Sequence, residues 1–155
     1  MRMPFLGWIL LGIPEGMALM FLAISLVSAS YKWKNIFVLG FVYSLGMYLI
    51  RLLPFTPGVH SLLGITEFML LLILFEKTEV KVATVVTLIS FISLLLFECI
   101  FYGLIIESGL VTQEIINTNL FVWVITGYPQ VIFLFLLGRI PNTHKLLERL
   151  TSKIL

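Results

Sequence analysis

The sequence predicts an all-α polytopic membrane protein, built as a bundle of about five transmembrane helices. Of its 155 residues, 60% are hydrophobic and only 12% are charged, whereas a soluble domain carries about 25% charged residues. The mean hydropathy is +1.11, and a soluble fold of this length could not hide so much apolar surface from water. A lipid bilayer removes that constraint, so we expect the bilayer to be a partner of this chain.

Five apolar segments approach the roughly 20 residues that cross the hydrocarbon core as a helix. They are Phe5–Ala29, Ile36–Leu53, Val59–Phe75, Val82–Ile106 and Phe121–Ile140. The longest connection is Glu107–Leu120, in which Thr112 is well placed to cap a short helix. We therefore predict one five-span transmembrane domain over residues 1–140.

Residues 141–155 form a second predicted unit, a cytoplasmic amphipathic tail helix. Asn142 and Thr143 are good capping residues at its start. Apolar side chains then recur at helical spacing, with charged residues between them. The apolar positions are Leu146, Leu147, Leu150 and Ile154. Such a helix lies on lipid headgroups or pairs with a partner helix, and lying on lipid is the simpler alternative.

The lysines and arginines in the short connections predict the orientation of the bundle, because cytoplasmic connections carry the positive excess. One side of the predicted bundle collects eight cations, and the other side has only Arg2 and Arg51. The eight are Lys32, Lys34, Lys77, Lys81, Arg139, Lys145, Arg149 and Lys153. We therefore expect a multi-pass protein of the cell membrane, with its N-terminus outside and its C-terminus in the cytoplasm.

The basic inner face also predicts lipid or partner contacts. The candidate contact residues are Lys32, Lys34, Lys77, Lys81, Lys145, Arg149 and Lys153. They could meet anionic lipid, recruit an acidic cytoplasmic protein or, as a less favoured alternative, bind RNA. The positive-inside bias alone explains most of these charges. A membrane anchor or scaffold is therefore one alternative function.

Four ionisable side chains fall inside the predicted spans, where each costs roughly 2.5–3.5 kcal/mol at mid-helix. They are Glu15, Arg51, Glu67 and Glu98. At a rise of about 1.5 Å per residue, they share the outer half of the membrane with Tyr128 and Gln130 of the last span. Pro14 and Pro129 lie in the same layer, and each is expected to kink or unwind its helix.

These polar groups predict a ligand pocket that opens to the outer side, since broken helices and buried charges mark the binding sites of transporters. The predicted ligand-binding residues are Glu15, Arg51, Glu67, Glu98, Tyr128 and Gln130. The alternative is structural: Arg51 pairs with one glutamate, and the other carboxyls are protonated and hydrogen-bonded between packed helices. The shared depth of these residues does not decide between a ligand pocket and a structural role, because it says nothing about which way each side chain points.

The sequence carries no motif of an enzyme. Intramembrane proteases use paired Asp residues, a Ser–His pair or His-Glu-x-x-His, and none of these motifs is present. No glycine-rich nucleotide-binding loop is present either. His60 and Glu67 share one helical face, but two ligands do not make a metal site. We therefore expect no catalytic residue, no metal and no cofactor.

Several short motifs resemble a known membrane region. They are Gly12-Ile-Pro14-Glu15-Gly16, Trp33-Lys34, Ile50-Arg51-Leu-Leu-Pro54 with Gly58-Val-His60, and Tyr128-Pro129-Gln130 before a Leu/Phe-rich stretch. They are similar to the multi-span N-terminal sensor region of Gram-positive, peptide-responsive histidine kinases of the accessory-gene-regulator type. The resemblance implies an outward-facing site for a small extracellular signal and a cytoplasmic dimerisation helix.

The sequence also departs from that family. Such kinases continue into a phosphoacceptor-histidine helix and an ATP-binding domain, which do not follow within these 155 residues. His144 does not stand in a phosphoacceptor motif. We therefore expect a sensor region without its kinase domain.

Taken together, these features favour a non-enzymatic membrane module that binds or senses a small ligand and signals through its tail, as a homodimer. A second alternative is a small, dimeric ion- or proton-coupled transporter. In that alternative Glu15, Glu67 and Glu98 exchange protons or cations with Arg51.

Overall fold

A computed structural model of the chain describes residues 5–28, 31–54, 57–109 and 111–140. Over these residues the chain is helical without strands, and five helices are long and apolar enough to cross a membrane. They are Phe5–Val27, Trp33–Leu52, Gly58–Phe75, Val80–Glu107 and Leu120–Gly138. The predicted all-α bundle with five candidate spans is confirmed. Arg2 and the predicted tail helix, with Lys145, Arg149 and Lys153, lie outside the described residues.

The first span is a continuous helix with a π-helical segment in front of Pro14. It consists of α1 (Phe5–Gly7), the π-helix η1 (Trp8–Gly12) and α2 (Ile13–Val27). Pro14 has no N–H to donate to the carbonyl four residues earlier, and its ring crowds that carbonyl. The wider π-helical turn accommodates the proline without unwinding the helix. The predicted interruption therefore takes the form of a change in helical winding.

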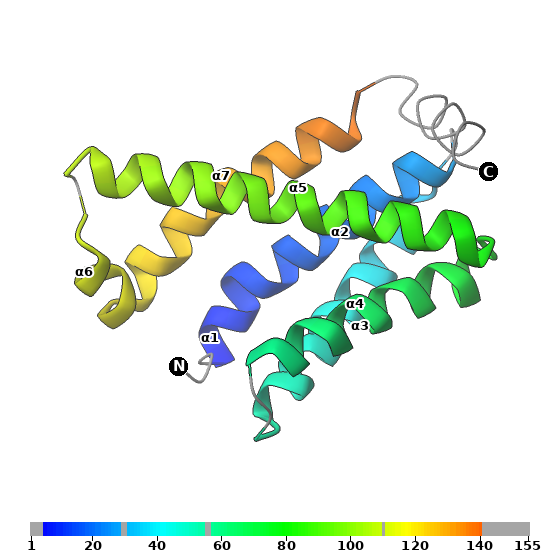
Figure 1. Cartoon of the computed structure of the whole chain (residues 1–155), viewed down its shortest axis with the longest axis horizontal. Helices are drawn as coiled ribbons and strands as arrows, with labels where there is room; N and C mark the ends of the chain where they lie inside the picture. Colours follow the sequence, from blue (N-terminus) through cyan, green and yellow to red (C-terminus); the bar gives the residue numbers. More distant parts are fainter. Residues whose placement is uncertain (1–4, 29–30, 55–56, 110, 141–155) are drawn as a thin grey trace.

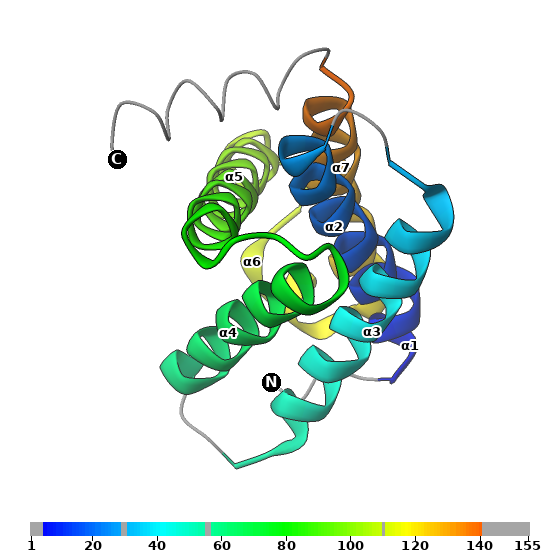
Figure 2. The same cartoon turned by 90° about the vertical axis from the view of Figure 1, so that its right-hand side faces the viewer.

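The span α2 is the central helix of the bundle. It contacts α3 (Trp33–Leu52), α5 (Val80–Glu107) and α7 (Leu120–Gly138), and Figure 2 shows these helices around it. Accordingly, every residue of α2 from Ala18 to Leu26 is buried. The helix α4 (Pro57–Phe75) packs against α3 and α5, and the short α6 (Gln113–Thr118) packs against α7.

Small residues let α2 and α3 approach each other closely. A Cβ atom on Gly16 would lie 2.8 Å from the carbonyl oxygen of Gly40, and one on Gly40 would lie 2.7 Å from the Cα of Met17. Both distances are too short for a real Cβ contact, so only glycine fits. Close backbone contact of this kind stabilises helix pairs in membranes, where the hydrophobic effect does not drive association.

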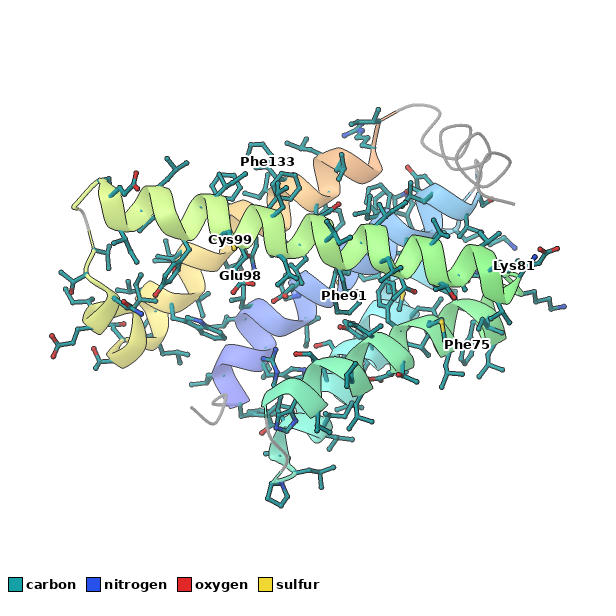
Figure 3. All side chains as sticks on the ribbon, in the orientation of Figure 1. Phe75, Lys81, Phe91, Glu98, Cys99 and Phe133 are labelled. Atoms are coloured by element: carbon teal, nitrogen blue, oxygen red, sulfur yellow. The ribbon has the colours of Figure 1, made fainter. Side chains whose placement is uncertain are left out.

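The spans alternate in direction, which gives the bundle two distinct ends (Figure 1). One carries the start of α1, the α3–α4 connection and α6, and is called here the N-terminal end. The opposite, basic end carries the exposed cations Lys32, Lys34, Lys77, Lys81 and Arg139. Asn35 Nδ2 donates a 3.2 Å hydrogen bond to Glu76 Oε1, which joins the start of α3 to the α4–α5 connection there. Lys81 projects away from the bundle (Figure 3).

Thr112 and Asn119 cap the last two helices of the described chain, α6 and α7. The predicted cap at Thr112 is confirmed, since its side chain accepts a long, 3.4 Å hydrogen bond from the N–H of Ile115 at the start of α6. Asn119 Oδ1 accepts from the N–H of Phe121 at 3.0 Å and caps α7. The helix α7 then continues through Pro129 without a break.

Candidate functional site

A cavity of about 380 Å³ lies among all five spans. Its lining residues come from the parts 8–16, 43–51, 61–65, 91–102 and 123–130 of the chain. In each span these residues belong to the part nearer the N-terminal end, as the direction of the helices shows (Figure 1). The cavity therefore occupies the half of the bundle that faces away from the exposed lysines.

Four of the six predicted ligand-binding residues line this cavity. Glu15 comes from α2, Arg51 from α3, Glu98 from α5 and Gln130 from α7. Glu15 is half-buried and lies within electrostatic reach of both Arg51 and Glu98. Gln130 is buried, whereas Arg51 and Glu98 are exposed. In Figure 3, Glu98 and Phe91 lie along the edge of α5 that faces α2.

The fifth predicted residue, Glu67, lies outside the cavity lining, between α4 and α3. Its carboxylate occupies the space that a Cβ atom on Gly46 would fill. Glu67 Oε2 is buried and has no hydrogen-bond partner within the described ranges. The cavity residue Tyr43 lies within electrostatic reach of both Glu67 and Glu15. Glu67 is therefore behind the cavity wall, and Tyr43 stands between it and the other charges.

The sixth predicted residue, Tyr128, also lies outside the cavity lining. Its hydroxyl donates a 2.9 Å hydrogen bond to the backbone carbonyl of Leu10 in η1. In a regular α-helix the N–H four residues later donates to the Leu10 carbonyl, but Pro14 occupies that position and has no N–H. Tyr128 therefore joins α7 to the irregular part of the first span, next to the site rather than in it.

Aromatic and hydroxyl side chains complete the cavity, and sequence reasoning missed them. They include Trp8, Tyr43, Ser44, Tyr48, Ser61, Tyr102, Trp123 and Thr126. Trp8 is 7% exposed, and its Nε1 donates a 2.9 Å hydrogen bond to the backbone carbonyl of Ser44. The available signal would have been a stripe of residues at helical spacing through the charged residue of a span. On α3, for example, it consists of Ser44, Met47, Tyr48 and Arg51.

Packed rings and aliphatic side chains close the cavity toward the basic end. Phe68 is fully buried and meets Tyr43 and Phe91 edge to face, with ring centroids 5.1 and 5.5 Å apart. Beyond these rings the buried stretch Ala18–Leu26 fills the bundle centre. These packed side chains thus lie between the cavity and the basic end.

The exposed lysines form no comparable site. Lys32, Lys34, Lys77 and Lys81 are spread over two connections at the basic end, and the cavity lies in the other half of the bundle. Within the part of the chain that the structure describes, no group of three or more His, Cys, Asp or Glu residues could hold a metal ion. Cys99 is exposed on α5.

Comparison with protein-family models, with curated proteins and with solved structures finds no match for this chain. The similarity to the sensor region of peptide-responsive kinases therefore stays a prediction.

Proposed function

We propose that this protein is a non-enzymatic, multi-pass sensor of the cell membrane, which binds a small ligand in the cavity and signals through its C-terminal tail. One observation carries the proposal. The same cavity gathers Glu15, Arg51, Glu98 and Gln130 from four helices, and one of these, α7, leads directly to residues 141–155.

The cavity favours ligand binding over packing as the role of the polar residues. Charged groups that only hold helices together are expected in a close-packed interface, because protein interiors leave few voids larger than a water molecule. Here Glu15, Arg51 and Glu98 surround about 380 Å³ of space. That volume falls within the roughly 300–1,000 Å³ that is typical of small-molecule sites.

The charge distribution supports an outward-facing cavity. The exposed cations of the basic end are expected on the cytoplasmic side, since positive residues are retained there. The opposite, N-terminal end then faces the exterior, and with it the half of the bundle that holds the cavity. This orientation lets an extracellular molecule reach Arg51 and Glu98 without crossing the membrane.

The helix α7 is the proposed output element. Gln130 meets the ligand, and two residues earlier Tyr128 holds α7 to Leu10. Pro129 lies between them and cannot donate its own helical hydrogen bond, so it is the natural hinge. A ligand that binds one position of α7 better than another shifts the population toward it. In a homodimer the tail helices would pass this change to a cytoplasmic partner.

The two alternatives have less support. A transporter needs a second state that opens to the other side, and Phe68 with the buried part of α2 packs between the cavity and the basic end. An anchor or scaffold that recruits a cytoplasmic protein or RNA has the exposed Lys32, Lys34, Lys77 and Lys81 in its favour. The positive-inside bias accounts for these lysines without any partner.

Native mass spectrometry of the purified full chain tests the proposal. The wild type, after exposure to extracts of culture medium, should retain a small molecule that Glu15→Gln and Glu98→Gln lose. Glu107→Gln is the matched control, because Glu107 is exposed at the end of α5 and does not line the cavity. Equal retention by all four proteins, or no retention by the wild type, would contradict the proposal.

A further inference from the structure

We infer that the cavity accepts a small monovalent organic cation, an ammonium group carried on an apolar body. The inference rests on the proposed function, for which it names the chemical class of the ligand. Charge, wall chemistry, an unsatisfied hydroxyl and size each point to this class.

The charge of the cavity wall favours a cation. Among the described residues that line the cavity, Glu15 and Glu98 provide two carboxyl groups, and Arg51 provides one guanidinium. Arg51 can balance only one of the carboxylates. Opposite charges on a ligand and its site make the two electrostatically complementary, so a cationic ligand supplies the counter-charge that the second carboxylate lacks. An anionic ligand would instead bring a third negative charge into the site.

The remaining wall is rich in aromatic rings. It contains Trp8, Tyr43, Tyr48, Phe91, Tyr102 and Trp123. The negative face of an aromatic ring attracts an ammonium group, and the attraction is stronger where water is excluded. The same rings offer apolar area to the body of the ligand. Carboxylates beside aromatic faces suit an organic cation better than a polar neutral molecule.

Ser44 provides a separate indication that a ligand with a hydrogen-bonding group belongs in the cavity. Its side chain is 3% exposed and lines the cavity, and its Oγ has no hydrogen-bond partner anywhere in the described part of the chain. A buried hydroxyl without a partner is unfavourable. An ammonium N–H can donate to Ser44 Oγ, and the side-chain carbonyl of the buried Gln130 provides a second acceptor.

The size of the cavity limits the ligand. A volume of about 380 Å³ corresponds to roughly a dozen water molecules at about 30 Å³ each. An arylalkyl ammonium ion fits this space, whereas a folded peptide could insert only one side chain. A bare metal ion would lack ligands, since no cluster of three ligating residues occurs within the described ranges.

Intrinsic fluorescence of the Trp33→Phe full chain in lipid nanodiscs tests the inference. Trp33 lies at the basic end, stacked on Phe21, so its removal leaves Trp8 and Trp123 in the cavity as reporters. The titrants are phenethylammonium, 2-phenylethanol and 3-phenylpropionate, which share the aryl body but carry positive, zero and negative charge. We expect saturable binding of the cation, at least tenfold tighter than either of the others.

Variants assign the binding to the proposed groups. Glu98→Gln should weaken phenethylammonium binding by about 30-fold, because it removes a charge-assisted hydrogen bond between the carboxylate and the ammonium group. Ser44→Ala should weaken it by about fivefold, while Glu107→Gln should leave it unchanged. Circular dichroism and gel filtration of each variant show whether it is folded. Ser44→Ala removes an unsatisfied hydroxyl and is expected to fold at least as well as the wild type.

The outcomes separate the ligand class from the function. If the alcohol or the carboxylate binds as tightly as the cation, or if Glu98→Gln has no effect, the cation class is wrong although the cavity still binds. If none of the three compounds gives a saturable change, the cation class is also overturned. The retention experiment above then decides independently whether the cavity has a ligand of another kind.

Discussion

The hydroxyl of Tyr128 in α7 donates a 2.9 Å hydrogen bond to the backbone carbonyl of Leu10 in η1. Pro14 stands four residues after Leu10 and has no N–H for that carbonyl. A side chain from another helix thus takes a place that the helix backbone would normally fill. The bond lies beside the cavity residue Gln130, so it joins the central span to the helix that we propose carries the signal.

Replacing Tyr128 by Phe should therefore weaken the attachment of α7. We expect a loss of about 0.6–1.7 kcal/mol in unfolding free energy, the range measured for interhelical hydrogen bonds in membranes. Unfolding in mixed micelles measures it. Tyr31→Phe is the control, because the Tyr31 ring packs on Phe21 and Trp33 at the other end of the bundle. Equal stability of Tyr128→Phe and the wild type would show that this hydrogen bond does not stabilise the bundle.

The close contact of α2 with α3 predicts a marked difference between two glycine-to-alanine changes. A Cβ atom on Gly40 would lie 2.7 Å from the Cα of Met17, whereas one on Gly103 in α5 would meet nothing within 4 Å. Gly40→Ala should cost about 1–3 kcal/mol through overpacking, and Gly103→Ala should cost nothing. If the same unfolding assay finds the two variants equally stable, the α2–α3 contact is not as described.

The position of Glu67 predicts coupling with Gly46. Gly46→Ala places a methyl group where the Glu67 carboxylate lies, so the flexible Glu67 side chain must move and the wild type should lose about 1 kcal/mol of unfolding free energy. In a Glu67→Ala background the same change should be tolerated, because the carboxylate is gone. A double-mutant cycle measures the coupling energy. Additive effects would place Glu67 away from Gly46.

The packed layer between the cavity and the basic end predicts that the protein does not conduct ions. Phe68, with Tyr43 and Phe91 around it, blocks the way to the basic end. Proteoliposomes that contain the purified chain should show no proton or potassium flux above that of empty vesicles. Phe68→Ala opens the packed layer and is the variant to compare with the wild type. Flux through the wild type that Glu15→Gln abolishes would favour the transporter alternative.

The helical spans were accessible to sequence reasoning because hydrophobic length alone selects them. The structure confirms five candidate spans, and each of their ends lies within three residues of the predicted one. Hydropathy could not show which span is central. In a membrane protein the side that faces lipid and the side that faces protein are similarly apolar, so the burial of α2 leaves no periodic pattern in its sequence.

The candidate site was predictable in depth but not in direction. Gln130 and Tyr128 lie two residues apart, which turns their side chains about 200° from each other on a helix. Gln130 lines the cavity and Tyr128 does not. Glu67 similarly shares the depth of Glu98 but packs against Gly46. Which way each side chain points follows from the packing of α3 and α7 on their neighbours, and that packing depends on glycine contacts far apart in the sequence.

Thiol accessibility in intact cells tests most directly whether these helices enclose an outward-facing, water-filled cavity. In a Cys99→Ser background, Thr126→Cys lies in the cavity wall, whereas its neighbour Ile125→Cys replaces a side chain that is 67% exposed on the bundle surface. A membrane-impermeant maleimide should label Thr126→Cys from outside and leave Ile125→Cys unreacted in lipid. Lys77→Cys should react only after lysis. Labelling of Ile125→Cys as fast as Thr126→Cys, or of Thr126→Cys only after lysis, would contradict the account.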